Sequence, residues 1–330
     1  MDDTMYLNNQ INFLLFLQNF RLATHDFFTP FFSFVTSLGE YLIPFTLCAI
    51  LYWNINKKLG TLIILSSSVT MMLCTLLKNM VCIYRPWILD QNITPVKSAL
   101  RLAGGYSFPS GHSALAVSCW GSIALSHLRN KKILWTMVFI CLFVAFSRLY
   151  LGVHTPQDVI IGLIVGTLCI LGVYKMMLFT ESNPKSDFLI ISIISAVSIA
   201  ILIYTYLKAY PLDYNLNGEI LVDPKRNKVE AFPKLGFLLG TLWGYYIERH
   251  FINFDPHKGS TKARIIRTII GILILIIISV YAAHFWHSFC NHPIANFCNM
   301  LTIGLYVTCI YPWCIKKHCL LTNKQCSKKH

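Results

Sequence analysis

Long apolar stretches recur along almost the whole 330-residue chain and limit what it can fold into. Hydrophobic residues make up 55% of the chain and charged residues only 13%, about half the charged share of a soluble domain. Apolar runs of about twenty residues are typical of transmembrane helices. Such runs cover residues 29–53, 59–80, 111–127, 133–150, 157–177, 188–207, 233–252, 266–285 and 295–315. The sequence therefore predicts an all-α, polytopic membrane helical bundle.

The basic residues lie mainly in the short connections between these runs. The chain has a net charge of +14, but its basic residues are dispersed instead of being gathered on one arm, so no nucleic-acid partner is expected. By the positive-inside rule, the most basic connections face the cytoplasm, and those after the second, fourth and eighth runs face outward. The connection 208–234 is an exception, because it is basic although this scheme places it outside. We predict a multi-pass protein of the cell membrane.

Three short polar motifs lie at the ends of apolar runs, where ionisable side chains are costly and often functional. In the first motif, Lys78 and Arg85-Pro86, the two cations are seven residues apart, about two turns of a helix. On one continuous helix they would share a face and could bind a phosphate group. Alternatively, both side chains only extend toward lipid head groups.

The second motif is Pro109-Ser110-Gly111-His112, at the start of the run 111–127. Ser110 can cap a helix whose first N–H groups then favour an anion, and Gly111 lets the backbone approach a ligand closely. His112 can deliver a proton to a leaving group. Alternatively, His112 is a structural histidine at the membrane interface.

The third motif joins Ser147-Arg148 to His154 and Asp158. Asp158 has two possible roles: it closes a capping box with Thr155, or it orients the imidazole of His154. Arg148 favours a phosphate site, because a planar guanidinium suits phosphate oxygens. All three motifs fall on the predicted outer side.

A few other polar residues have weaker signals. Glu40 lies within the first apolar run, and we expect its carboxylate to support Lys78 or Arg85 from behind the site. No metal site is expected in the aromatic-rich loop around Cys290, which suits a membrane-interface belt better, and Cys290 and Cys298 are either bridged or free. The cysteines and histidine of the C-terminal tail lack paired spacing for metal: Cys314, His318, Cys319 and Cys326.

Together the three motifs resemble the signatures of the type 2 phosphatidic acid phosphatase superfamily, KxxxxxxRP, PSGH and SRxxxxxHxxxD. The resemblance covers roughly residues 27–180 and includes every signature position. It implies a metal-independent phosphohydrolase without a cofactor. In that scheme His154 is the nucleophile, Asp158 holds it, and His112 acts as general acid and then as base. The phosphate would be bound by Lys78, Arg85, Ser110, Gly111 and Arg148.

The resemblance also implies a six-helix phosphatase-type core followed by about three extra C-terminal transmembrane helices. We accordingly divide the chain into 1–26, an interfacial amphipathic segment, 27–207, the core with the motifs, and 208–330, a membrane extension of unknown role. We further expect the connection 208–234 to cover or tune the mouth of the site. Glycines repeated at four-residue spacing, such as Gly162 and Gly166, are typical of close helix contacts.

The function implied is an integral membrane lipid phosphatase that forms a phosphohistidine and works on the outer face of the bilayer. Its partners would be the bilayer and a lipid phosphate monoester or a polyprenyl pyrophosphate. Two alternatives remain open: a lipid phosphotransferase of the same fold, and a non-catalytic transporter or scaffold that only binds lipid phosphate. A vanadium haloperoxidase shares the motifs, but nine lipid-embedded runs disfavour it.

Overall fold

The computed structural model describes residues 3–40, 42–101, 103–215 and 217–317. Within them the regular structure is helical, apart from an isolated antiparallel bridge between Tyr214 and Ile220. The predicted all-α class is therefore confirmed. The chain forms two compact units, of which the first contains Met1–Pro44, Leu73–Gly172 and Tyr204–Val229. The second contains Phe45–Met72, Val173–Ile203 and Glu230–His330.

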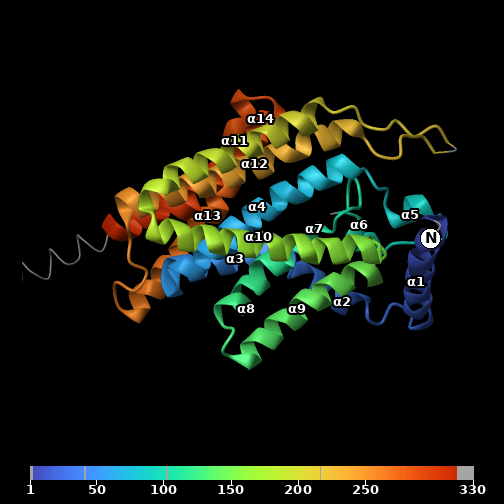
Figure 1. Cartoon of the computed structure of the whole chain (residues 1–330), viewed down its shortest axis with the longest axis horizontal. Helices are drawn as coiled ribbons and strands as arrows, with labels where there is room; N and C mark the ends of the chain where they lie inside the picture. Colours follow the sequence, from blue (N-terminus) through green and yellow to red (C-terminus); the bar gives the residue numbers. More distant parts are fainter. Residues whose placement is uncertain (1–2, 41, 102, 216, 318–330) are drawn as a thin grey trace, which may run out of the picture. The chain divides into compact units, whose positions relative to one another are not determined.

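The first unit combines several short helices with long helices that belong to it wholly or in part (Figure 1). Its helices are α1 (Asp3–Ala23), α2 (Thr29–Ser37), α5 (Pro86–Leu89), α6 (Lys97–Leu100), α7 (Gly111–Ala116), η2 (Val117–Gly121), α8 (Ser122–Ser126), α9 (Lys131–Tyr150), the end of α4 (Lys57–Val81) and most of α10 (Pro156–Ser182).

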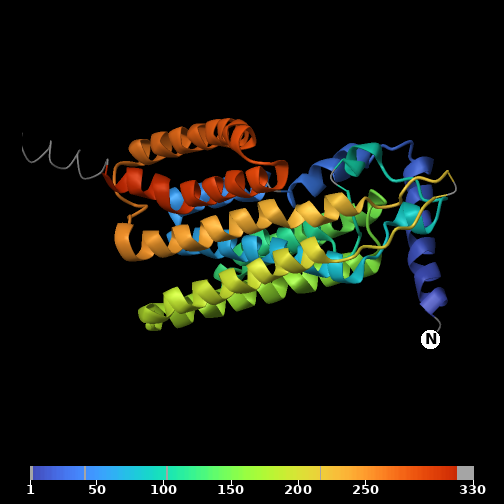
Figure 2. The ribbon, with the colours of Figure 1, turned by 90° about the horizontal axis from the view of Figure 1, so that it is seen from above.

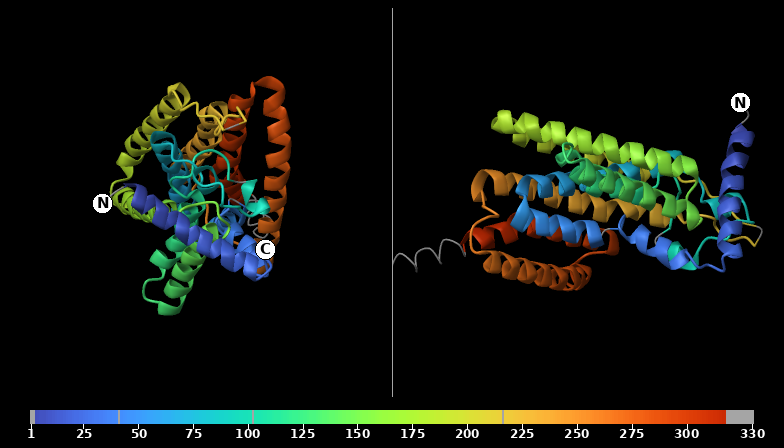
Figure 3. Two further views of the ribbon diagram at one scale, coloured as in Figure 1. Left: turned by 90° about the vertical axis from the view of Figure 1, so that its right-hand side faces the viewer. Right: turned by 90° about the horizontal axis from the view of Figure 1, so that it is seen from below.

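Helix α1 runs crosswise to α9 and α10 (Figures 1 and 3). Its inner face buries Ile11 and Leu14 against Ile93. The Gln10 side chain accepts a hydrogen bond of 2.9 Å from the Gln157 N–H at the start of α10. Its outer face is also apolar, because Phe16 is 65% exposed. The interfacial placement of this segment stays a prediction.

Small residues let α10 lie close to the start of α7. A Cβ atom at Gly162 would lie 2.6 Å from the Ser110 carbonyl oxygen, and one at Gly166 would lie 2.5 Å from the Ala114 carbonyl oxygen. Real Cβ atoms do not approach so closely, so these two positions require glycine. The four-residue spacing therefore brings the backbone of α10 against the PSGH motif.

The second unit contains the C-terminal helices. A short connection joins α13 to α14, and these two helices lie side by side (Figure 2). Glycines of α12 contact α14, since Cβ atoms at Gly236 and Gly240 would meet the carbonyl oxygens of Phe297 and Leu301. The larger part of α4 and the end of α10 also belong to this unit. Its other helices are α3 (Leu42–Ile50), η1 (Leu51–Ile55), η3 (Pro184–Ser186), most of α11 (Asp187–Leu207) and of α12 (Pro224–Ile247), η4 (Glu248–Ile252), α13 (Thr261–Phe289), α14 (His292–Leu305) and η5 (Tyr306–Ile310).

In the described residues the predicted apolar runs lie on helices, with the run 29–53 divided between α2 and the pair α3 and η1. Not every run is long and apolar enough to cross a bilayer. Among the described residues, six helical segments are long and apolar enough to cross a bilayer. The number is seven if the bent pair Thr29–Ser37 and Leu42–Ile55 is one span. The run 111–127 is not among them, because its helical part ends at Ser126 and is short. The run 233–252 is not either, since α12 also carries a charged first half.

Candidate active site

The three motifs meet in the first unit, and their side chains are removed from solvent. Those of the third motif show this best, since Arg148, His154 and Asp158 are 1%, 2% and 1% exposed. Ser110 is fully buried, and its N–H donates to the Asp158 carbonyl oxygen at 2.9 Å. Ionisable groups buried this deeply need partners of opposite charge or a ligand.

The imidazole of His154 lies between a cation and a carboxylate. Its Nε2 is 3.0 Å from NH1 of Arg85, and its Nδ1 is 3.3 Å from Oδ2 of Asp158. A guanidinium has only donors, so the Nε2 atom that it contacts must be the acceptor. The proton therefore sits on Nδ1, facing Asp158, and the lone pair sits on Nε2. This tautomer leaves Nε2 as the ring nitrogen that has a lone pair available.

One carboxylate satisfies both of the roles considered for Asp158. Its Oδ2 accepts a hydrogen bond of 2.8 Å from the Thr155 N–H, while the Asp158 N–H donates to Oγ1 of Thr155 at 3.4 Å. That reciprocal pair is a capping box at the start of α10. The same Oδ2 faces His154 and accepts a 2.5 Å bond from the Ser107 hydroxyl. Helix capping and imidazole orientation are therefore coupled in one side chain.

Lys78 and Arg85 do not share a helix, and this expectation was wrong. Helix α4 ends at Val81, Cys82 has a φ of 56°, and Arg85 is extended before Pro86, as residues before proline tend to be. The loop 104–107 brings the two cations together instead. Lys78 Nζ donates to the Tyr106 carbonyl at 2.9 Å, and Arg85 NH2 donates to the Gly104 carbonyl at 3.1 Å.

Arg148 has unused hydrogen-bonding capacity. Its NH1 donates to Oγ1 of Thr36 at 2.6 Å, but its Nε and NH2 are buried without a hydrogen-bond partner in the described part of the chain. A buried donor left unpaired is costly, and more so when charged. An anion would satisfy both donors. Gly111 leaves room for one nearby, because a Cβ atom there would meet nothing within 4 Å.

His112 faces a different carboxylate from that of His154. Its Nε2 lies 3.9 Å from Oε1 of Glu40, within ion-pair range but too long for a hydrogen bond. The structure thus pairs Glu40 with His112, not with Lys78 or Arg85 as the sequence suggested. The His112 side chain is 15% exposed, against 2% for His154. This greater access suits a group that exchanges protons with substrate or water.

Sequence reasoning missed Ser107 and Thr36. Ser107 stands two residues before the PSGH motif, and its position beside a motif is the only sequence signal that it has. Thr36 has no such sequence signal, because it lies on another helix, 112 positions before Arg148 in the sequence. Both hydroxyls contact predicted site residues and orient them.

Electrostatics favour a neutral imidazole at His154. Burial, and then the positive charges of Arg85, Arg148 and Lys78, hold the pKa of His154 well below its usual value of 6.5. An imidazole in the neutral form has a lone pair and is a competent nucleophile at neutral pH.

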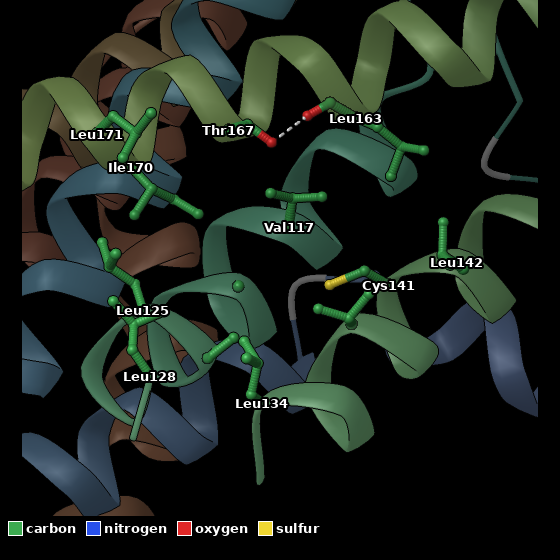
Figure 4. A pocket seen from close by; sticks show the side chains of 13 residues that line it. Val117, Leu125, Leu128, Leu134, Cys141, Leu142, Leu163, Thr167, Ile170 and Leu171 are labelled. Atoms are coloured by element: carbon green, nitrogen blue, oxygen red, sulfur yellow. Dashed lines mark hydrogen bonds between the residues drawn. The ribbon is translucent and has the colours of Figure 1, made fainter. Parts of the chain in front are cut away.

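A separate pocket in this unit is apolar. It has a volume of about 340 Å³ and contains none of the predicted site residues (Figure 4). Thr167 is its one hydroxyl, and it donates back to the Leu163 carbonyl at 2.8 Å. The lining therefore offers hydrocarbon surface and no group for phosphate chemistry.

The histidine- and cysteine-rich segments form no metal cluster in the described residues. Cys290 and Cys298 are both free thiols, so the disulfide considered for them is not present. His318, Cys319 and Cys326 of the predicted tail lie outside the described residues.

The fold and the motifs together define a multi-pass membrane protein with a buried, cation-rich histidine site. Residues 59–181 match the sequence profile of the PAP2 superfamily, and residues 232–323 match that of the transmembrane extension of PAP2 superfamily phosphatases. Through these two segments the chain belongs to the PAP2 superfamily. The matched extension lies within the predicted C-terminal segment 208–330, while the three-part division itself stays a prediction.

Named relatives act on several kinds of phosphate. The chain is 33% identical to an undecaprenyl-diphosphatase of Sulfolobus acidocaldarius, over 41% of this chain and 63% of that protein. It is 35% identical to a lipid A 4'-phosphatase of Porphyromonas gingivalis, over 30% of this chain and 42% of that protein. It is 27% identical to the glucose-6-phosphatase catalytic subunit 1 of Haplochromis xenognathus, over 64% of this chain and 84% of that protein.

For the first two of these relatives the match spans less than two thirds of their length. No solved structure matches the chain.

Proposed function

We propose that this protein is an integral membrane phosphatase that hydrolyses a lipid phosphate monoester or an isoprenyl pyrophosphate through a phosphohistidine. The observation that carries the proposal is the setting of His154. Its Nε2 lone pair is held by Arg85 on one side, while Asp158 fixes the opposite nitrogen. Arg148 contributes two buried donors that need an anion.

In the first step, Nε2 of His154 attacks the phosphorus, and the bond from phosphorus to the leaving oxygen breaks. His112 gives its proton to that oxygen, so an alcohol or a phosphate leaves. Lys78, Arg85, Arg148, Ser110 and the Gly111 N–H neutralise and position the phosphoryl oxygens, which is most of what phosphoryl transfer requires.

In the second step, His112 takes a proton from water, and the water oxygen attacks the phosphorus. The bond between nitrogen and phosphorus breaks and inorganic phosphate leaves, with the imidazole of His154 returned to its neutral form. Throughout both steps the proton stays on Nδ1 of His154, hydrogen-bonded to the Asp158 carboxylate. The carboxylate stabilises the positive charge on the phosphorylated ring.

The reaction in this proposal needs no metal. Three cationic side chains already surround the phosphate position, and they would repel a divalent cation as much as they attract the substrate. The active site would face the extracytoplasmic side of the cell membrane, as the distribution of basic connections indicates. A lipid chain could then stay in the bilayer while its head group reaches the site.

The test is phosphate release by the purified full chain in lipid nanodiscs, in EDTA, over a panel of substrates. The panel contains phosphatidate, a sphingoid phosphate, polyprenyl pyrophosphates and, as a soluble comparison, glucose 6-phosphate. We expect release from the lipid substrates and a loss of at least about 1,000-fold in His154→Ala. Equal activity in His154→Ala, or a requirement for metal, would refute the mechanism.

Two other outcomes separate the alternatives. Transfer of labelled phosphate to an added lipid or sugar acceptor, in place of free phosphate, would identify a phosphotransferase. Binding of lipid phosphate without turnover of any panel member would identify a transporter or scaffold.

A further inference from the structure

The segment 204–229 belongs to the same compact unit as the candidate site, although it starts 46 residues after Asp158 (204 − 158) in the sequence. It is anchored where α4 ends. Lys208 Nζ donates to the carbonyls of Asn79 and Met80, the latter at 3.2 Å. The last carbonyl groups of a helix lack partners within the helix, and Lys208 provides donors for two of those in α4.

Aromatic contacts continue this attachment toward the site. The hydroxyl of Tyr84 donates to the carboxylate of Asp213. The ring of Tyr210 stacks on that of Tyr106, with centroids 6.3 Å apart. Tyr106 is also the residue whose carbonyl accepts from Lys78. The segment is therefore packed against the loop that holds the two cations of the first motif.

This packing brings Arg226 to the edge of the site. The guanidinium of Arg226 occupies the space where a Cβ atom of Gly104 would stand, so a larger residue there would displace this side chain. The carbonyl of the same glycine accepts from NH2 of Arg85. The guanidinium groups of Arg85 and Arg226 are therefore less than about 10 Å apart, given ordinary backbone dimensions.

The two arginines differ in their surroundings. Arg85 is 3% exposed and contacts His154, whereas Arg226 is exposed and no acidic side chain in the described residues forms an ion pair with it. Arg101, exposed three residues before Gly104, is near enough to interact with Glu40 electrostatically. The guanidinium groups of Arg85 and Arg226 repel each other at their separation of less than about 10 Å unless an anion lies between them.

We propose that Arg226 binds the second phosphate of a diphosphate substrate, so that the site selects prenyl diphosphates over monoesters. This inference rests on the proposed function, in which Arg85 and Arg148 hold the phosphoryl group that is transferred. The leaving phosphate of a diphosphate extends beyond that group and carries additional negative charge. A guanidinium at the rim can bind it through two parallel hydrogen bonds, which a monoester has no group to accept.

The experiment compares farnesyl diphosphate with farnesyl phosphate, because the two share one hydrocarbon chain. The full chain is assayed in nanodiscs as wild type, Arg226→Ala, Arg226→Lys and Lys225→Ala. Lys225 is the matched control, since it is an exposed cation next in sequence. We expect Arg226→Ala to lower kcat/KM for the diphosphate by about 10- to 100-fold and to leave the monophosphate within about 2-fold. Lys225→Ala should change neither, and Arg226→Lys should be intermediate.

Equal losses on both substrates, or no loss on the diphosphate, would overturn the assignment. A thermal shift provides a readout that does not need turnover: inorganic pyrophosphate should stabilise the wild type more than Arg226→Ala, while phosphate stabilises both equally. If His154→Ala retains wild-type activity, the proposed function fails and this inference falls with it. If activity depends on His154 but not on Arg226, only this inference fails.

Discussion

NH1 of Arg85 lies 3.0 Å from Nε2 of His154, so the guanidinium contacts the nitrogen that would attack phosphorus. The same NH1 also donates to the Val153 carbonyl at 2.9 Å. A bound phosphate would compete for these donors, and turning the guanidinium toward it would release the lone pair of Nε2. In the proposed mechanism this contact would keep His154 in its reactive tautomer until an anion arrives.

The first prediction is a covalent intermediate on His154. Replacing His112 by Asn removes the group that activates water, so hydrolysis of the intermediate should slow more than its formation when the leaving group is a good one. With a ³²P-labelled diphosphate, label should stay on the protein and be released by acid but not by base, as expected for phosphohistidine. His154→Ala is the control and should retain no label. Label on a hydroxyl or carboxyl side chain would contradict the mechanism.

The second prediction concerns pH. Because the pKa of His154 is held below 6.5 by burial and by neighbouring cations, the imidazole stays neutral in mildly acidic solution. The acid limb of kcat/KM, which reports groups of the free enzyme, should therefore have its midpoint below 6.5 once the ionisation of the substrate is taken into account.

Lys78→Met tests the sign of this effect. It removes one of the positive charges that disfavour the imidazolium, so the pKa of His154 should rise and the acid limb should move to higher pH. A shift to lower pH would show that a different group sets this limb.

The third prediction separates the two roles of Asp158. Asp158→Asn cannot hold the Nδ1 proton in the same way and should lower kcat by about 10³- to 10⁴-fold. Thr155→Val removes only the hydroxyl that accepts from the Asp158 N–H, so it should cost about 1 kcal/mol of stability with kcat within a few-fold of wild type. Activity and thermal denaturation of both variants provide the measurement. Similar kcat values would mean that capping alone explains the carboxylate.

The fourth prediction uses a matched pair of glycines in α10. An alanine at Gly162 would push on the Ser110 carbonyl, so Gly162→Ala should lower both the denaturation temperature and the activity, by about 10-fold for the latter. A Cβ atom at Gly172 would meet nothing within 4 Å, and alanine is the better helix former. Gly172→Ala should accordingly raise stability slightly and leave activity unchanged. Identical behaviour of the two variants would show that the contact between α10 and the PSGH turn is unimportant.

The features predicted from the sequence are those set by neighbouring residues. Apolar run length placed the helices, since each backbone group in lipid must be paired within its own segment. Cap chemistry also placed helix starts well. The Ser110 side chain accepts from the Ser113 N–H at the start of α7, and Thr155 with Asp158 caps α10. Such interactions span three or four residues, so their spacing is visible in one dimension.

Only the tertiary structure decided how the motifs meet. In it, the helix that contains Lys78 ends before Arg85, and both cations donate hydrogen bonds to the loop 104–107. It paired Glu40 with His112 and set Arg226 on Gly104. These contacts link residues tens to more than a hundred positions apart, and packing, not local spacing, determines which distant side chains become neighbours.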